Sequence, residues 1–180
     1  NAQGLAEIFE QRLSDIGNDV TLKSMDDFKP KNLKKVEDLF IITSTHGEGD
    51  PPDNAVELHE YIHGRKAPKL DGVRFSVLAL GDQTYEFFCQ TGKDFDNRLA
   101  ELGAERLYHR TDCDVDYEED AEKWMANVIN TIDSTPAGTE SEQVVSESIK
   151  SAKEKKYSKS NPYDAEVLTN IKIGRASCRE

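Results

Sequence analysis

The sequence has a deficit of positive charge. It contains 23 Lys and Arg residues against 35 Asp and Glu residues, which gives a formal net charge of −12. A surface of this sign repels the phosphates of nucleic acids and of anionic membranes, so neither nucleic acid nor a membrane is an expected partner. It favours a protein partner with a basic face. Acidic surfaces are common, so the charge alone identifies no partner.

Cysteine is scarce and long apolar runs are missing. The three cysteines, Cys89, Cys113 and Cys178, have no metal-binding spacing and form no even set for disulfides, which is typical of a reducing compartment. No run approaches the roughly 20 apolar residues needed to cross a bilayer. No signal peptide is visible. These absences together predict a soluble, cytoplasmic protein.

What the sequence does contain is a regular alternation of helical and strand-like patterns. Apolar residues at three-and-four spacing predict helices over about 2–16, 53–63, 92–102 and 121–132. Asn1 and Asp53 are expected to cap the first two, and Gly17 to end the first. Short apolar runs predict strands over about 20–25, 39–42, 73–80 and 105–108. The alternation predicts an α/β fold with a doubly wound parallel sheet.

Loops that follow three of these strands carry the candidate site. Loops 43–53, 80–92 and 108–120 leave the carboxyl ends of parallel strands, where ligands of open α/β sheets bind. The middle loop reads LGDQTYEFFCQTG, with three aromatic residues just beyond a buried strand. Aromatics in this place can stack on a flat ring, and Gly81 allows backbone amides to approach it. The alternative is a surface loop held by buried Phe side chains.

The other two loops add glycines and carboxylates. The glycines of STHGEGD, residues 44–50, allow backbone N–H groups to approach a ligand edge. His46 either stacks or donates a hydrogen bond there, or is an ordinary exposed loop histidine. A site of this kind suits a flat redox cofactor, and nearby carboxylates would disfavour an anionic, fully reduced flavin. The candidates are Asp82, Asp112, Asp114 and Asp116, each of which has the alternative of being a solvated loop carboxylate.

Several other residues receive structural interpretations. His59 and His63 stand four apart on a helix, like half a metal site, but no third ligand is near them in sequence, so no metal is predicted. His109 ends a strand and is interpreted as structural. Cys89 is interpreted as a small packing residue that a neighbouring flavin could oxidise. Trp124 continues an apolar helical stripe and is assigned to the core.

Beyond residue 133 the pattern changes. Residues 134–160 are rich in Ser, Glu and Lys, which predicts a flexible linker. Residues 161–173 regain alternation and are interpreted as the first strand of a second domain. Residues 174–180 break that pattern, and with Ile173 they read IGRASCRE, which matches a translated sequencing adapter. We therefore predict that 174–180 is a non-native tail.

Two long motifs carry a resemblance to a known family. STHGEGDPPDNA and LGDQTYEFFCQTGKDFDNRLAELGAERL resemble the flavodoxin-like FMN domain of diflavin reductases. Among these, the flavoprotein (alpha) subunits of assimilatory NADPH–sulfite reductases are the most similar, over residues 1–133. NPYDAEVLTNIKI resembles the opening of the reductase domain that follows in this family and binds FAD and NADPH.

The resemblance implies five parallel strands in the order 2-1-3-4-5 and an FMN site. Here the family's first strand and most of its phosphate loop are absent, so the central position of the sheet is expected to be open. The chain is then expected to fold marginally and to bind FMN weakly or not at all. The residues implied to bind FMN are Asn1, Ala2, Ser44, Thr45, His46, Gly47, Leu80, Gly81, Asp82, Gln83, Thr84, Tyr85, Glu86, Phe87, Phe88, Cys89, Asp114 and Asp116.

The function implied is electron transfer in sulfate assimilation. NADPH would reduce FAD in the following domain, FAD would reduce FMN here, and FMN would pass electrons to the sulfite-reducing haemoprotein (beta) subunit. No residue is expected to act as an acid, base or nucleophile. The alternatives are the FMN domain of another diflavin reductase, such as a cytochrome P450 reductase, a free flavodoxin-type carrier, or an interaction module without a cofactor.

Overall fold

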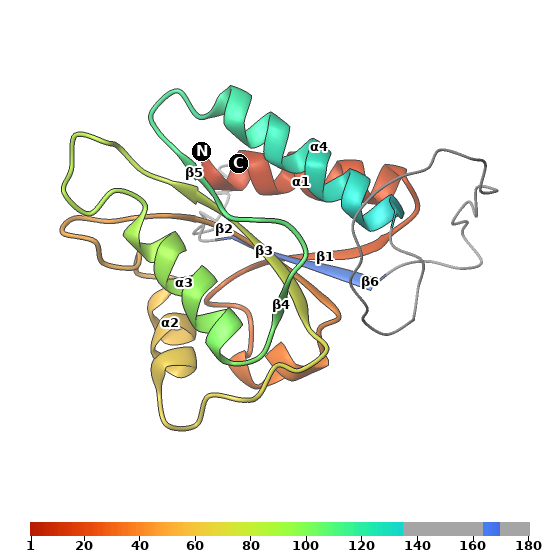
Figure 1. Cartoon of the computed structure of the whole chain (residues 1–180), viewed down its shortest axis with the longest axis horizontal. Coiled ribbons are helices and arrows are strands. Elements are labelled where there is room, and N and C mark those ends of the chain that lie inside the picture. Colours follow the sequence, from red (N-terminus) through yellow and green to blue (C-terminus); the bar gives the residue numbers. More distant parts are fainter. Residues whose placement is uncertain (135–163, 170–180) are drawn as a thin grey trace, which may run out of the picture.

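The computed structural model describes residues 1–134 and 164–169 (Figure 1). Its helices are α1 (Ala2–Asp15), α2 (Val56–His63), α3 (Gln90–Glu101) and α4 (Glu118–Ser134), with a short 3₁₀ helix η1 (Pro30–Lys35). Its strands are β1 (Asp19–Ser24), β2 (Asp38–Ser44), β3 (Arg74–Leu80), β4 (Glu105–Arg106), β5 (Thr111–Cys113) and β6 (Asp164–Thr169). For β6, only the backbone pairing with its neighbouring strands is described.

All strand pairs in this sheet are parallel. The strand order is β1-β6-β2-β3-β4, and β5 also pairs with β3, beyond the end of β4. The longest ladder joins β2 to β3, from the pair Asp38 and Arg74 to the pair Ser44 and Leu80. Both strands are buried along almost their whole length, as expected for a parallel sheet with covered faces.

Helices cover the sheet on both sides. In Figure 1, α1 and α4 lie on one face, and α2 and α3 lie on the other. Alternate residues of β2 follow this division, since Phe40 and Ile42 pack with α1 and α4, whereas Leu39 and Ile41 pack with α2 and α3. Trp124 is buried and donates from Nε1 to Ser76 Oγ at 2.9 Å, so its assignment to the core is confirmed. The predicted doubly wound α/β fold is confirmed as well.

The central position of the sheet is filled by β6. This strand pairs in parallel with β1 on one side and β2 on the other, over residues 164–169. The sequence predicted an open position here and assigned 161–173 to a second domain, so the placement differs from that prediction. The physical reason is hydrogen bonding, because an open position would leave the facing N–H and C=O groups of β1 and β2 unpaired. That the chain folds marginally stays a prediction.

Smaller differences concern the ends of elements. α2 starts at Val56 with Ala55 as its N-cap, so Asp53 is not the cap that the sequence predicted. β4 is reduced to two residues, and Thr111–Cys113, predicted as loop, pairs with β3 as β5. Asn1 and Gly17 lie where they were predicted, at the N-cap of α1 and in a left-handed conformation after it, with φ +97° at Gly17.

Two predicted segments lie outside the part of the chain that the structure describes. The predicted linker 134–160, apart from Ser134 at the end of α4, and the predicted tail 174–180 lie outside it, and both stay predictions. Within residues 1–134 and 164–169, none of the helices combines the length and apolar character that a membrane crossing requires.

Candidate functional site

A cavity of about 680 Å³ opens at the carboxyl ends of β2 and β3. It is bounded by the start of α1, by the loop 44–47 after β2, and by the loop 80–89 after β3. Thirteen of the residues predicted to bind a cofactor line it: Asn1, Ala2, Ser44, Thr45, His46, Gly47, Leu80, Gly81, Asp82, Tyr85, Phe87, Phe88 and Cys89. The structure thus brings together three segments that lie far apart in the sequence.

The first loop is a tight hairpin. His46 N–H donates to Asp50 O at 2.9 Å, and Asp50 N–H donates back to His46 O at 2.9 Å. Gly47 and Gly49 take positive φ values, +50° and +104°, which turn the chain between these two residues. His46 itself is exposed at the mouth of the cavity, so it is available to a ligand there.

The second loop presents its aromatic residues outward. Asp82 organises its start, because Thr84 N–H and Thr84 Oγ1 both donate to Asp82 Oδ1, at 2.8 and 2.6 Å. These bonds lower the pKa of Asp82. Tyr85 and Phe87 remain 62% and 38% exposed. Tyr85 is therefore not one of the buried aromatic side chains that the alternative, a surface loop held by the core, would require.

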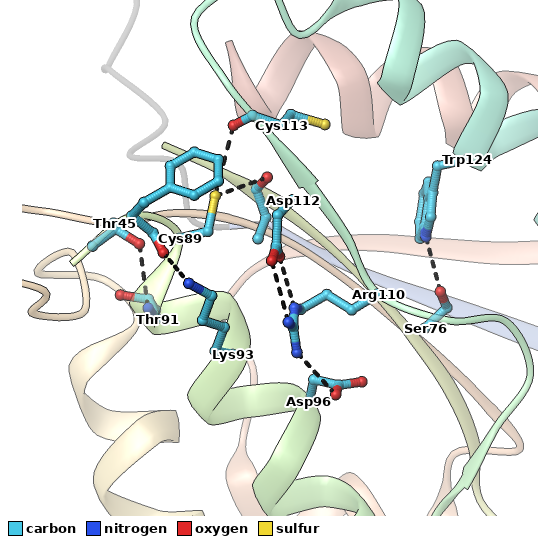
Figure 2. A network of polar contacts seen from close by, with 12 residues as sticks. Thr45, Ser76, Cys89, Thr91, Lys93, Asp96, Arg110, Asp112, Cys113 and Trp124 are labelled. Atoms are coloured by element: carbon cyan, nitrogen blue, oxygen red, sulfur yellow. Dashed lines mark hydrogen bonds and ion pairs between the residues drawn. The ribbon is translucent and has the colours of Figure 1, made fainter. Parts of the chain in front are cut away.

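Cys89 ends this loop beneath the cavity. It is fully buried and has φ +54°, in the left-handed region that non-glycine residues rarely occupy. Its single S–H is shared between two acceptors, Ala79 O at 3.5 Å and Cys113 O at 3.6 Å from the sulfur (Figure 2). Burial raises the pKa of the thiol to about 12, so it stays protonated at neutral pH. The interpretation of Cys89 as a packing residue agrees with this geometry.

The remaining predicted site residues do not line the cavity. Asp114, in the acidic loop, accepts a hydrogen bond from Gln83 N–H at 3.0 Å and so ties the two loops together. Asp112 is paired with Arg110 at 2.7 Å, so it is not simply a solvated carboxylate. The residues that do not line the cavity are Gln83, Thr84, Glu86, Asp114 and Asp116.

The start of α1 suits an anionic group. Asn1 makes no side-chain capping bond, and the first turn contains no acidic residue. The first backbone bond of this helix is donated by Leu5 to Asn1 O, as expected for a helix whose earliest N–H groups point outward. Since Asn1 and Ala2 line the cavity, the positive end of the helix dipole faces into it.

Residues 1–124 match the model of the flavodoxin family. The chain belongs to the flavodoxin family. A flavodoxin from Streptococcus pneumonia TIGR4 has a similar structure, with 26% sequence identity and a TM-score of 0.65, over 73% of this chain and 90% of that one. Oxidised flavodoxin 1 from Bacillus cereus, at 17% identity and a TM-score of 0.63, covers 76% of this chain and 92% of its own, and shares the fold.

Two curated relatives are similar over the whole flavodoxin-family chain. The sulfite reductase [NADPH] flavoprotein alpha-component of Bacillus subtilis is 52% identical over 181 residues, and that of Vibrio parahaemolyticus is 46% identical over 183. Both alignments include 100% of this chain but only 30% and 29% of the relative. The chain therefore spans less than a third of the length of these relatives.

The first turn of α3 is hydrogen-bonded to both main loops of the candidate site in this flavodoxin domain. The sequence did not predict this role. Thr91 N–H donates to Thr45 Oγ1 at 3.2 Å, and Thr91 Oγ1 donates to Asp50 O at 3.0 Å (Figure 2 shows the first of these). Lys93 Nζ donates to Phe88 O at 2.6 Å. No signal in the sequence marks these roles, because a Thr and a Lys at a helix start are ordinary.

His59 and His63 belong to α2 of the flavodoxin domain, and His59 faces α3. Their rings are tilted by 33° with centroids 4.3 Å apart, and His59 Nε2 lies 3.6 Å from Asp94 Oδ2. Among the described residues there is no group of three or more potential ligands placed to hold a metal ion. Burial, and then the neighbouring His63, lower the pKa of His59 below its usual 6.5, while Asp94 and Glu60 oppose this.

We expect His59 to make the flavodoxin domain less stable in mild acid. With its pKa lowered in the folded state, His59 takes up a proton more readily in the unfolded chain, so stability is lost as the pH falls below about 6.5. Urea unfolding at pH 7.5 and 5.5 should show this loss in the parent sequence. His59→Gln should show less of it, and an identical pH dependence in the two proteins would contradict the assignment.

Proposed function

We propose that this flavodoxin domain binds FMN and carries electrons for an NADPH-dependent sulfite reductase. The observation that carries the proposal is the cavity, which joins an exposed aromatic side chain, two glycine-containing loops and an uncapped helix start. No group in it is arranged as a nucleophile or a general base. Bound FMN would supply the redox chemistry, and the residues around it would bind and orient it.

The residues at the cavity fit the parts of FMN. Tyr85 offers an exposed ring for stacking on the isoalloxazine. Because Gly47 has no side chain, the turn there brings backbone alone to the edge of the cavity. The N–H groups at the start of α1 are suited to the phosphate. The isoalloxazine ring and the phosphate of FMN would thus meet a stacking surface and an anion site on different walls of one cavity.

The sulfite reductase assignment is supported by the relatives. Their names give flavoprotein components of NADPH-dependent sulfite reductase, and the similarity to them extends over the whole chain. In the proposed complex, this domain would hold FMN, which would supply electron transfer between an NADPH- and FAD-binding domain and the haemoprotein (beta) subunit. A cytoplasmic location is part of the same proposal. A cytochrome P450-type reductase and a free carrier are the alternatives.

An FMN titration followed by quenching of flavin fluorescence tests the flavin assignment. We expect weak binding to this chain, because the described cavity offers the phosphate the start of α1 at Asn1 and Ala2 as its anion site. A longer form, with the family's first strand and phosphate loop added before Asn1, should bind tightly. Riboflavin, which lacks the phosphate, should bind the longer form less well than FMN does. Absence of quenching in both forms would overturn the assignment.

Tyr85→Ala should weaken FMN binding strongly. Loss of a stacked ring costs about 1–3 kcal/mol in comparable base-stacking sites, which corresponds to a rise in Kd of about 5- to 150-fold. Tyr85→Phe is the matched control, since it keeps the ring and removes only the hydroxyl. Its Kd for the longer form should stay within about twofold, a change worth less than RT in binding free energy. Equal Kd values for the alanine variant and the parent would remove Tyr85 from the site.

Electron transfer from the flavoprotein to the haemoprotein subunit tests the sulfite reductase assignment. The whole flavoprotein, reduced with NADPH, should support sulfite reduction when it is mixed with the haemoprotein subunit. A form from which residues 1–133 are deleted should still oxidise NADPH with small artificial acceptors but should not support sulfite reduction. Full sulfite reduction without residues 1–133 would contradict the proposed place of this domain in the electron path.

A further inference from the structure

We propose that Thr45 and Thr91 are positioning residues that join the two cavity loops into one rigid unit. The inference rests on the proposed FMN site, and it assigns the Thr45 hydroxyl to holding that site together and not to contacting the ring. Thr45 belongs to the loop after β2, and Thr91 belongs to the first turn of α3, which directly follows the loop after β3.

The start of α3 lacks a cap from its own chain segment. Its N-cap residue is Cys89, which makes no side-chain capping bond. A helix leaves its first N–H groups without helical partners, and one of them here belongs to Thr91, which is fully buried. The Thr45 hydroxyl accepts this N–H at 3.2 Å, so the cap is supplied by the other loop.

The Thr91 hydroxyl in turn donates a hydrogen bond to the loop whose Thr45 caps α3. Its hydroxyl donates to Asp50 O at 3.0 Å, and the same carbonyl accepts the His46 N–H at 2.9 Å. Asp50 O is therefore the point where the hairpin 46–50 is both closed and attached to α3. Thr45 is also held at its backbone, because its N–H donates to Leu80 O at 3.2 Å. The two threonines thus bond the two segments reciprocally.

Direct packing between the loops reinforces these bonds. A Cβ added to Gly49 would lie 2.9 Å from the Phe87 Cβ, so the hairpin and the aromatic loop are in close contact. The aromatic loop is itself attached to α3 through Lys93 and to the sheet through Cys89 (Figure 2). Both walls of the cavity therefore share one support, the first turn of α3, and loosening it should move the walls relative to each other.

The test uses valine, which keeps the shape of threonine and removes the hydroxyl. The variants are Thr45→Val, Thr91→Val and the double substitution, made in this chain and in the longer form. Thr131→Val is the matched control, since the Thr131 hydroxyl also bonds a backbone carbonyl, Asn127 O at 2.8 Å, but lies on α4. Two quantities are measured: the Kd for FMN, and amide hydrogen exchange without FMN.

Each single substitution should raise the Kd for FMN about tenfold. Thr45→Val leaves the buried Thr91 N–H without its acceptor, and Thr91→Val removes the bond that attaches the hairpin 46–50 to α3. The double variant should also be weakened about tenfold and not a hundredfold, since two bonds of one unit couple. Without FMN, Thr45→Val should accelerate exchange at the Thr91 amide, and Thr91→Val should accelerate it at the His46 and Asp50 amides. Thr131→Val should change neither quantity.

The outcomes separate this inference from the proposed function. If no form of the protein binds FMN, the proposed function fails, while local acceleration of exchange would still support the joint unit. Accelerated exchange with an unchanged Kd would overturn the positioning role. Additive effects on the Kd, or exchange that is unchanged at the hairpin in Thr91→Val, would overturn the claim that the loops act as one unit.

Discussion

Replacement of Arg74 by alanine should destabilise the domain by about 3–5 kcal/mol, the usual cost of leaving one partner of a buried ion pair alone. Asp38 is fully buried at the start of β2. Arg74, its register partner on β3, donates from Nε and Nη2 to the two carboxylate oxygens at 2.7 and 2.9 Å. Without the guanidinium, the carboxylate keeps its desolvation cost and loses its two charged donors. Urea unfolding at pH 7.5 measures the difference.

The matched control is Arg12→Ala. Arg12 also donates two hydrogen bonds to one carboxylate, from Nη1 and Nη2 to Glu122 at 2.7 and 2.8 Å, but both side chains are exposed. An exposed pair contributes about 0–1 kcal/mol, so the control should be nearly neutral. Equal losses in the two variants would show that burial of Asp38 is not the cause.

The loss in Arg74→Ala should also depend on pH. Burial raises the pKa of Asp38 to about 7, and Arg74 opposes that rise, so removing Arg74 raises the pKa further. A carboxyl with a raised pKa in the folded state holds a proton that the unfolded chain releases, so its stability contribution is present below about pH 3.8 and is lost as the pH rises toward 7. The variant should therefore be closer to the parent at pH 5 than at pH 8. Asp38→Asn added to Arg74→Ala should remove this pH dependence.

Gly92→Ala should have the second large effect, a destabilisation of about 1–3 kcal/mol from overpacking. Gly92 lies in the first turn of α3, and a Cβ on it would overlap the Cβ of Ala79 on β3 and lie 3.3 Å from its Cα. The helix must therefore move off the sheet to accept one methyl group. Because this turn supports both cavity loops, FMN binding by the longer form should weaken together with stability.

Two further variants check the cause. Ala79→Gly, added to Gly92→Ala, removes the opposing methyl and should recover part of the loss, although a glycine in a strand itself costs about 0.5–1 kcal/mol. Gly4→Ala is the matched control for a helical glycine, because nothing lies within 4 Å of the added Cβ. It should stabilise α1 by about 0.5–1 kcal/mol. A loss in Gly4→Ala similar to that in Gly92→Ala would show that the close approach of α3 and β3 is not the cause.

The sequence alone determined the layers of this protein and the place of its site. Alternation along residues 39–42 decides which side chains face α1 and α4 and which face α2 and α3, because the period of two is local information. The loops that line the cavity follow from the same reading, since parallel strands bring their carboxyl ends to one edge. Here the local pattern and the global arrangement agree.

Which segments pair with one another depends on the three-dimensional arrangement of the chain. A strand pattern such as that of residues 164–169 fits any parallel position with two covered faces, so its place between β1 and β2 depends on which backbone groups remain unpaired. The bonds from Thr91 to Thr45 and Asp50, and the pairing of Asp38 with Arg74, join residues 36 to 46 positions apart. Spacing in the sequence carries no information about such contacts, because they form only when the sheet sets the distance between its elements.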